Sequence, residues 1–207
     1  MPPGRRRLCA VLALSLSTPS GLPAQTAVRA QPLGPTADAS PRGPFAVGTT
    51  TVEVTGVAWI ESWNKNLTTD RLLGGRVVVG QDWKPDWQAI AELEIHRAAL
   101  QERPDPLLAG LSGLIRRRVG SLGTLDAFIE TGLGAAIASR PVPSGGTEVN
   151  FLLQVGGGIS SRLSPTTSLI VGTRLWHLSN GGIIRNDRHN PDIEGLGGYA
   201  GLQVHFR

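Results

Sequence analysis

The sequence predicts an all-β protein, an eight-stranded antiparallel transmembrane β-barrel of the outer-membrane type. After residue 44 the chain is a series of short runs in which apolar and polar residues alternate, which is the period of a strand with two unlike faces. Glycine occurs 27 times, and no stretch has convincing helical amphipathicity. No run of 18 apolar residues follows the N-terminal segment, which excludes a membrane protein built from helices.

The first 24 residues have the layout of a secretory signal peptide. Three arginines at 5–7 precede the apolar run 8–14, and small residues and prolines follow as far as Ala24. The apolar run is too short to span a bilayer as a helix. We place the cleavage site after Ala24, and Ala27 and Ala30 are the alternatives.

The mature chain then consists of a leader and one barrel. Cys9 is the single cysteine and leaves with the signal peptide, so disulfide or thiol chemistry is not expected. Residues 25–44 are rich in Pro, Ala, Gly and Thr and lack periodicity, so we expect a flexible leader. Residues 45–207 form the predicted barrel domain.

Four strands are expected in the first half of the barrel, at 51–60, 72–80, 88–97 and 107–117. In each, apolar residues recur at alternate positions, interrupted in places by glycine and least regularly in 107–117, and alternate residues of a strand share a face. The apolar sets are Val52, Val54, Ala58 and Ile60, then Leu73, Val77 and Val79, then Ala89, Ala91, Leu93 and Ile95, and finally Leu107, Ala109, Leu111 and Ile115.

Four further strands are expected in the second half, at 124–136, at 148–160, in a run ending at Ser179 and in a run from Glu194 to Phe206. The apolar sets are Leu125, Ala127, Ile129, Leu133 and Ala135, then Val149, Phe151, Leu153 and Val155, then Leu169, Val171 and Leu175, and finally Leu196, Ala200, Leu202, Val204 and Phe206.

Two all-β architectures fit this alternation. A soluble sandwich turns its apolar faces inward, whereas an outer-membrane barrel turns them towards lipid and its polar faces towards a small lumen. The signal peptide and an alternating last strand with a near-terminal aromatic residue favour the barrel. So do the opposite charges of the polar faces, which can pair inside: Glu53, Glu92, Glu94 and Glu130 against Arg76, Arg116 and Arg174.

The charge balance is basic. The formal net charge is +4, and the cations comprise 18 arginines and the two lysines Lys65 and Lys84. A basic balance favours an anionic partner. An exported chain fits anionic lipid, and nucleic acid is not expected as a partner.

A histidine, a hydroxyl and a carboxylate gather where the last two predicted strands meet. His177 and Ser179 continue the apolar face of the seventh strand, and Glu194 opens that of the eighth. Even-stranded barrels keep both termini in the periplasm, so these residues are expected at the outer-leaflet end, facing lipid. Such residue types can form a nucleophile, its base and the group that orients the base.

The stretch from Arg174 to Gly182, Arg-Leu-Trp-His-Leu-Ser-Asn-Gly-Gly, followed by Asn-Pro-Asp-Ile-Glu at 190–194, resembles the lipid A 3-O-deacylase (PagL) family. The resemblance implies an outer-membrane esterase that removes the 3-O-linked acyl chain of lipid A in lipopolysaccharide. It implies Ser179 as nucleophile, His177 as general base and Glu194 as the partner of His177. The loop before Glu194 is longer than the family pattern.

Residues beside this triad are expected to support the chemistry. Backbone N–H groups of Asn180 and Gly181 can stabilise an oxyanion, and Asn190 matches the family's loop asparagine associated with that role. Arg185 and Arg188 in the loop are candidates for binding substrate phosphates, and a solvated loop without that role is the alternative.

No cofactor and no metal are expected. His177, His189 and Glu194 are metal-ligand types, but no short ligand spacing supports a site. The competing hypothesis is a non-enzymatic eight-stranded outer-membrane barrel with a structural or adhesive role. Strand alternation alone cannot separate that hypothesis from the esterase, whereas the geometry of the three polar residues can.

Overall fold

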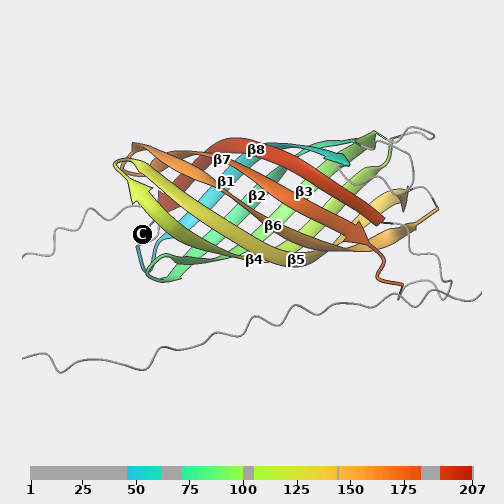
Figure 1. The fold of residues 1–207 in the computed structure, drawn as a ribbon, viewed down its shortest axis with the longest axis horizontal. Coiled ribbons are helices and arrows are strands. Elements are labelled where there is room, and N and C mark those ends of the chain that lie inside the picture. The colour runs from blue at the N-terminus through green and yellow to red at the C-terminus, as the bar shows by residue number, and fades with distance from the viewer. Residues whose placement is uncertain (1–45, 62–70, 100–104, 144, 183–191, 207) are drawn as a thin grey trace, which may run out of the picture. The chain divides into compact units, whose positions relative to one another are not determined.

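In the computed structural model the chain forms a closed barrel of eight strands (Figure 1). The structure describes residues 46–61, 71–99, 105–143, 145–182 and 192–206, so the predicted signal peptide and leader lie outside the described residues. The strands are β1 (Thr50–Glu61), β2 (Arg71–Lys84), β3 (Trp87–Ala99), β4 (Leu107–Leu122), β5 (Leu125–Val142), β6 (Thr147–Ser164), β7 (Thr167–Ser179) and β8 (Asp192–Phe206).

Each strand pairs antiparallel with the next, and β1 closes the barrel by pairing with β8 from Thr50 opposite Phe206 to Glu61 opposite Gly195. The predicted fold class is therefore confirmed. β5 extends well beyond the predicted end at residue 136, because its ladder with β6 resumes after an irregularity, at Val142 opposite Thr147. Among the described residues, no helix is long and apolar enough to cross a membrane.

The two ends of the barrel differ. At the end that holds the start of β1 and the end of β8, the connections are two residues long, at 85–86, 123–124 and 165–166. Short turns beside both termini mark the periplasmic side of outer-membrane barrels. β7 runs away from that end, towards the right in Figure 1, and stops at Ser179 at the opposite end.

Apolar side chains cover the outer wall, as the alternation predicts. Leu73, Leu111 and Leu133 are each more than 60% exposed, whereas Leu72 and Ser112, beside the first two on their strands, are buried. A soluble sandwich would bury the three exposed leucines, because water contact with so much apolar surface is unfavourable. The outer face therefore suits lipid.

Arginines and carboxylates fill the middle of the lumen as a network. Arg116 hydrogen-bonds Glu53 and, at 2.9 Å, Glu130. Arg174 donates to Glu130 at 2.6 Å and to Glu92 at 2.7 Å. These side chains are fully enclosed, so each charge depends on its partners for the hydrogen bonds that water would otherwise provide.

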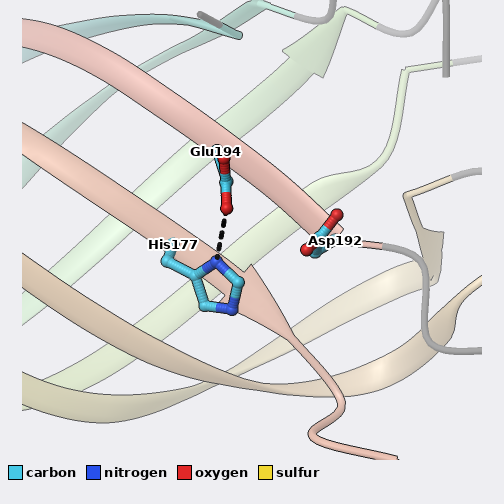
Figure 2. A group of neighbouring side chains, drawn as sticks. All are labelled: His177, Asp192 and Glu194. Carbon is cyan, nitrogen blue, oxygen red and sulfur yellow. Dashed lines mark ion pairs between the residues drawn. The ribbon is translucent and has the colours of Figure 1, made fainter. Parts of the chain in front are cut away.

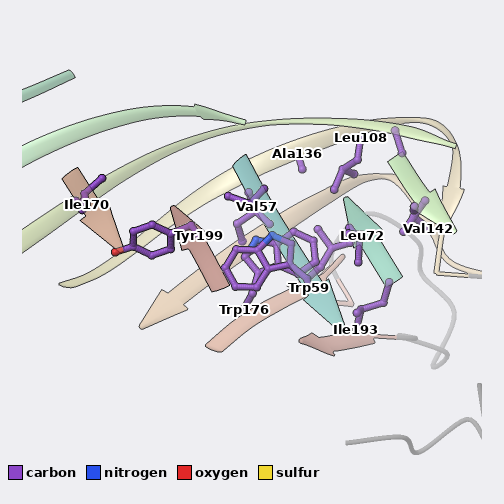
Figure 3. Packing of buried hydrophobic residues seen from close by; sticks show 14 of the residues in the cluster. Val57, Trp59, Leu72, Leu108, Ala136, Val142, Ile170, Trp176, Ile193 and Tyr199 are labelled. Atoms are coloured by element: carbon purple, nitrogen blue, oxygen red, sulfur yellow. The ribbon is translucent and has the colours of Figure 1, made fainter. Parts of the chain in front are cut away.

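The lumen is less polar than the expected inward faces suggest. A buried apolar cluster occupies much of it, and Trp59 and Trp176 stack with ring centroids 6.0 Å apart (Figure 3). Leu178 and Ile193, which belong to the same cluster, are fully buried. They lie beside His177 and Glu194 in the sequence but point inward, so the wall behind these polar residues is packed with hydrocarbon.

Candidate active site

The end of β7 places a histidine and a serine on the outer face of the barrel. His177 Nε2 lies 3.0 Å from Ser179 Oγ, which is hydrogen-bonding distance. Residues i and i+2 of a strand point to the same side, so the strand itself brings the two groups together. Ser179 is only 6% exposed, whereas the side chain of His177 is 37% exposed. The hydroxyl is therefore enclosed beside an accessible imidazole.

The start of β8 supplies the carboxylate. Glu194 lies directly opposite His177 in the β7–β8 register. Glu194 Oε1 is 3.8 Å from His177 Nδ1, across the hairpin (Figure 2). This distance exceeds that of a hydrogen bond, so the carboxylate faces the ring as an ion-pair partner in the present geometry. Each ring nitrogen of His177 thus faces one of the other two residues.

A tight turn follows Ser179. The Gly182 N–H donates to Asn180 Oδ1 at 2.8 Å, and Asn180 is 1% exposed. Gly181 and Gly182 have φ values of 64° and 69°, a left-handed conformation that glycine adopts without the steric cost paid by other residues. The turn therefore holds its backbone in a defined shape next to the serine.

A groove of about 460 Å³ opens on the outer wall beside this cluster. Leu153, Val155 and Leu175 line it with hydrocarbon, and His177 and Glu194 line it with polar groups. A groove with this lining can accept an apolar chain, and a polar group at the end of that chain would lie next to His177.

Asp192 is a site residue that the sequence analysis missed. It pairs with Ser179 in the strand register, and Figure 2 shows it beside His177 and Glu194. His177, Asp192 and Glu194 offer ligand atoms within 4.8 Å of one another, so the three could hold a metal ion. Such binding would compete with the contacts that His177 makes to Ser179 and Glu194. Asp192 could have been predicted from the sequence, because it is two residues before Glu194 and such residues of a strand share a face.

The remaining predicted site residues lie in the loop between β7 and β8. Asn190, Arg185 and Arg188, and the alternative metal ligand His189, lie outside the described residues. Their roles stay predictions. The structure does bring together Ser179, His177 and Glu194, with Asn180 and Gly181 adjacent.

The family model described as lipid A 3-O-deacylase (PagL) matches residues 55–203, well over half of the chain. The chain belongs to the lipid A 3-O-deacylase (PagL) family. It is thus an ester hydrolase in the form of an outer-membrane β-barrel, as its resemblance to the family predicted. A search of curated proteins found no significant match.

Solved structures show a similar fold at low sequence identity. Neisserial surface protein A (NspA) is 16% identical with a TM-score of 0.54, covering 76% of this chain and 96% of its own. OprG from Pseudomonas aeruginosa is 10% identical with a TM-score of 0.52, covering 78% and 97%. The outer membrane enzyme PagL is 17% identical with a TM-score of 0.47, covering 76% and 98%. The family assignment rests on the family model, and the first two structures support the fold alone.

Proposed function

We propose that this chain removes the 3-O-linked acyl chain of lipid A with Ser179 as nucleophile, His177 as general base and Glu194 as the residue that orients His177. The observation that carries the proposal is the 3.0 Å contact between His177 Nε2 and Ser179 Oγ on the lipid-facing wall. Family membership supports the substrate class, and the geometry supports the assignment of roles.

The reaction follows from the positions of these atoms. His177 Nε2 takes the proton of Ser179 as Oγ attacks the ester carbonyl, and Glu194 stabilises the resulting imidazolium. The tetrahedral intermediate collapses when His177 returns the proton to the 3-hydroxyl oxygen of the sugar, which leaves. Water, activated by His177, then hydrolyses the acyl-serine ester. The products are a free fatty acid and lipid A with one hydroxyl restored.

The oxyanion of the tetrahedral intermediate needs donors. The backbone N–H groups of Asn180 and Gly181 are candidates because they follow Ser179 directly, in a turn held by the Asn180 side chain. The side chain of Asn190 is a further candidate. Arg185 and Arg188 are proposed to bind the phosphates of lipid A.

The location of the site explains how an acyl ester can reach it. The groove beside His177 opens directly to the outer wall, and Leu153, Val155 and Leu175 can take the acyl chain. A lipid substrate in this groove lies against His177, whose Nε2 is 3.0 Å from Ser179 Oγ, without leaving the membrane. The site lies at the end of the barrel away from the short turns and the termini, which is the level of the lipopolysaccharide leaflet.

A second serine–histidine pair makes the same contact at a place that a lipid substrate cannot reach. Ser168 Oγ lies 2.9 Å from His205 Nε2, but both residues are buried and point into the lumen. No lipid ester can reach Ser168 there, so we assign no reaction to this pair. It serves as an internal control for the experiment below.

The decisive test is mass spectrometry of lipid A from cells that express this chain. The wild type should produce lipid A lighter by one 3-O-linked acyl chain, Ser179→Ala should leave it intact, and Ser168→Ala should behave as wild type. Unmodified lipid A in cells that hold a folded wild-type barrel would contradict the proposal and favour the non-enzymatic alternative.

A further inference from the structure

A second groove lies on the outer wall, between β3 and β6. It has a volume of about 360 Å³ and is lined by Trp87, Ile115, Arg117, Ile129, Glu130, Thr131, Val155 and Gly156. The Glu130 carboxylate is buried and pairs with Arg116 and Arg174 in the lumen. We call this second groove the Arg117 groove. Of the lining residues, it shares Val155 alone with the groove beside His177, and it extends towards the end of the barrel where β1 starts and β8 ends.

One end of the Arg117 groove is cationic and aromatic. Lys84 pairs with Trp87 across β2 and β3, and Trp87 pairs with Arg117 across β3 and β4. Lys84 Nζ is 4.6 Å from the ring centroid of Trp87 and 4.7 Å from that of Trp83. The Arg117 guanidinium carbon is 5.1 Å from the Trp87 ring. The indole of Trp87 therefore lies between two cations and holds both near the mouth of the groove.

Within the described part of the chain, neither Lys84 nor Arg117 forms an ion pair with a carboxylate. The next residue, Arg118, does so, because it contacts Asp86 and, at 3.2 Å, Asp126. Arg117 points outward, between the lipid-facing residues Ile115 and Val119. A charge on the lipid face is tolerated near the membrane interface far better than at the midplane. Arg117 and Lys84 thus present positive charge at interface level, where lipid headgroups lie.

The rest of the groove is apolar. Ile115, Ile129 and Val155 supply hydrocarbon, and Thr131 turns its hydroxyl away to the Gln154 carbonyl at 3.0 Å. Gly157, opposite Ile129 in the register, has no side chain to fill the surface. A cationic mouth joined to an apolar channel matches a lipid with an anionic headgroup and a hydrocarbon tail.

We infer that the Arg117 groove binds one anionic phospholipid of the periplasmic leaflet. Arg117 and Lys84 would pair with its phosphate, Trp87 would contact the glycerol region, and one acyl chain would lie along Ile115 and Thr131. The positive charges of Lys84 and Arg117 favour an anionic headgroup, and the position of the groove beside the short turns favours a lipid of the periplasmic leaflet. This site is separate from the ester-cleaving residues and does not depend on their assignment.

The test is native mass spectrometry of the full, folded chain in detergent, titrated with phosphatidylglycerol or phosphatidylcholine. The wild type should retain one phosphatidylglycerol and markedly less phosphatidylcholine. Arg117→Gln should lower the retained phosphatidylglycerol several-fold. Thr131→Phe should lower retention of phosphatidylglycerol as well, because the ring fills the channel while both cations remain.

Arg140→Gln is the matched control, since it removes one exposed arginine on β5 at the opposite end of the barrel. It should retain phosphatidylglycerol as the wild type does. Equal losses in Arg117→Gln and Arg140→Gln, or equal retention of the two phospholipids, would overturn the site. A dimer that dissociates in Thr131→Phe would also overturn the site, because it would mean that a second copy of the chain occupies the groove. If Arg117→Gln fails to fold by circular dichroism, Thr131→Phe and the comparison of lipids decide the question.

Discussion

The indole of Trp176 stacks on that of Trp59 inside the barrel, with an angle of 19° between the ring planes. Trp176 precedes His177 on β7, and Trp59 belongs to β1, so the stack joins the strand that bears the proposed base to the first strand of the barrel. Both rings are 1% exposed. The imidazole on the outer face is thus backed by a rigid aromatic pair on the inner face.

Removing that support should affect both stability and turnover. Trp176→Ala deletes a fully buried indole, which typically costs about 3–5 kcal/mol of unfolding free energy. The vacated space should also let the end of β7 shift, which lowers kcat through the position of His177. Urea unfolding in detergent and deacylation of purified lipid A measure the two effects. Trp83→Ala, at a 51% exposed indole, should alter neither quantity much.

The triad assignment predicts that Ser179→Ala and His177→Ala each abolish deacylation while the barrel stays folded. Groups that act as one unit fail together, so the double variant should be no worse than either single variant. Ser168→Ala, which removes the buried hydroxyl bonded to His205, is the matched comparison and should keep its activity. Activity close to wild type in Ser179→Ala would exclude the serine mechanism.

Substitutions of Glu194 and Asp192 test which of the two carboxylates orients His177. Glu194 is opposite His177 in the register, whereas Asp192 is opposite Ser179, so Glu194 is the expected orienting group. Glu194→Ala should lower kcat by up to about 10⁴-fold yet leave a measurable rate, since Glu194 orients His177 and transfers no proton. Asp192→Ala should have a much smaller effect on kcat. The reverse order in steady-state kinetics would reassign the partner of His177 to Asp192.

The loop before β8 yields a separate prediction. If Asn190 donates to the oxyanion, Asn190→Ala should lower turnover by about 10²–10³-fold with little change in KM or stability. Arg185→Ala and Arg188→Ala should instead raise KM for bisphosphorylated lipid A and nearly preserve kcat. Lipid A that lacks phosphate provides the control, because with that substrate the arginine variants should match the wild type. A high KM for both substrates would disprove phosphate recognition by these arginines.

The orientation of the wall can be tested by placing a charge on each face. Leu169→Arg and Leu202→Arg put arginine on the outer face, which costs about 2–4 kcal/mol at the midplane of a bilayer and less near its surface. Both should fold less well into liposomes. Gln203→Arg, inside the lumen beside Glu53, should act mainly through packing. Folding yields that fall equally in all three variants would argue against a lipid-facing outer wall.

Strand alternation predicted the strands and their two faces, because the period of two specifies which residues share a face. The signal peptide, the opposite charges of the polar faces and the near-terminal aromatic residue were also needed to choose a barrel over a sandwich. Alternation placed His177 and Ser179 on one side of a strand and Glu194 on the neighbouring strand without any coordinates. Alternation does not reveal how far one strand is shifted against another. For that reason the sequence did not predict that Asp192 lies opposite Ser179 or that Trp59 stacks on Trp176, and both are known from the structure.

The interior was predicted less completely than the wall. Pairing of Arg116 and Arg174 with lumenal carboxylates followed from opposite charges on the inward faces. The inward packing of Leu178 and Ile193 did not follow, because these residues sit between polar outward residues and interrupt the expected pattern. At the proposed site the usual distribution of side chains is reversed, because His177 and Glu194 lie on the outer face whereas Leu178 and Ile193 point into the lumen.

The ion pairs and indoles that occupy the lumen have a consequence for the cell as well as for the fold. Arg116, Arg174 and Trp176 fill space that a wider barrel would leave to water. A barrel filled in this way can span a membrane without opening a wide aqueous route through it for solutes.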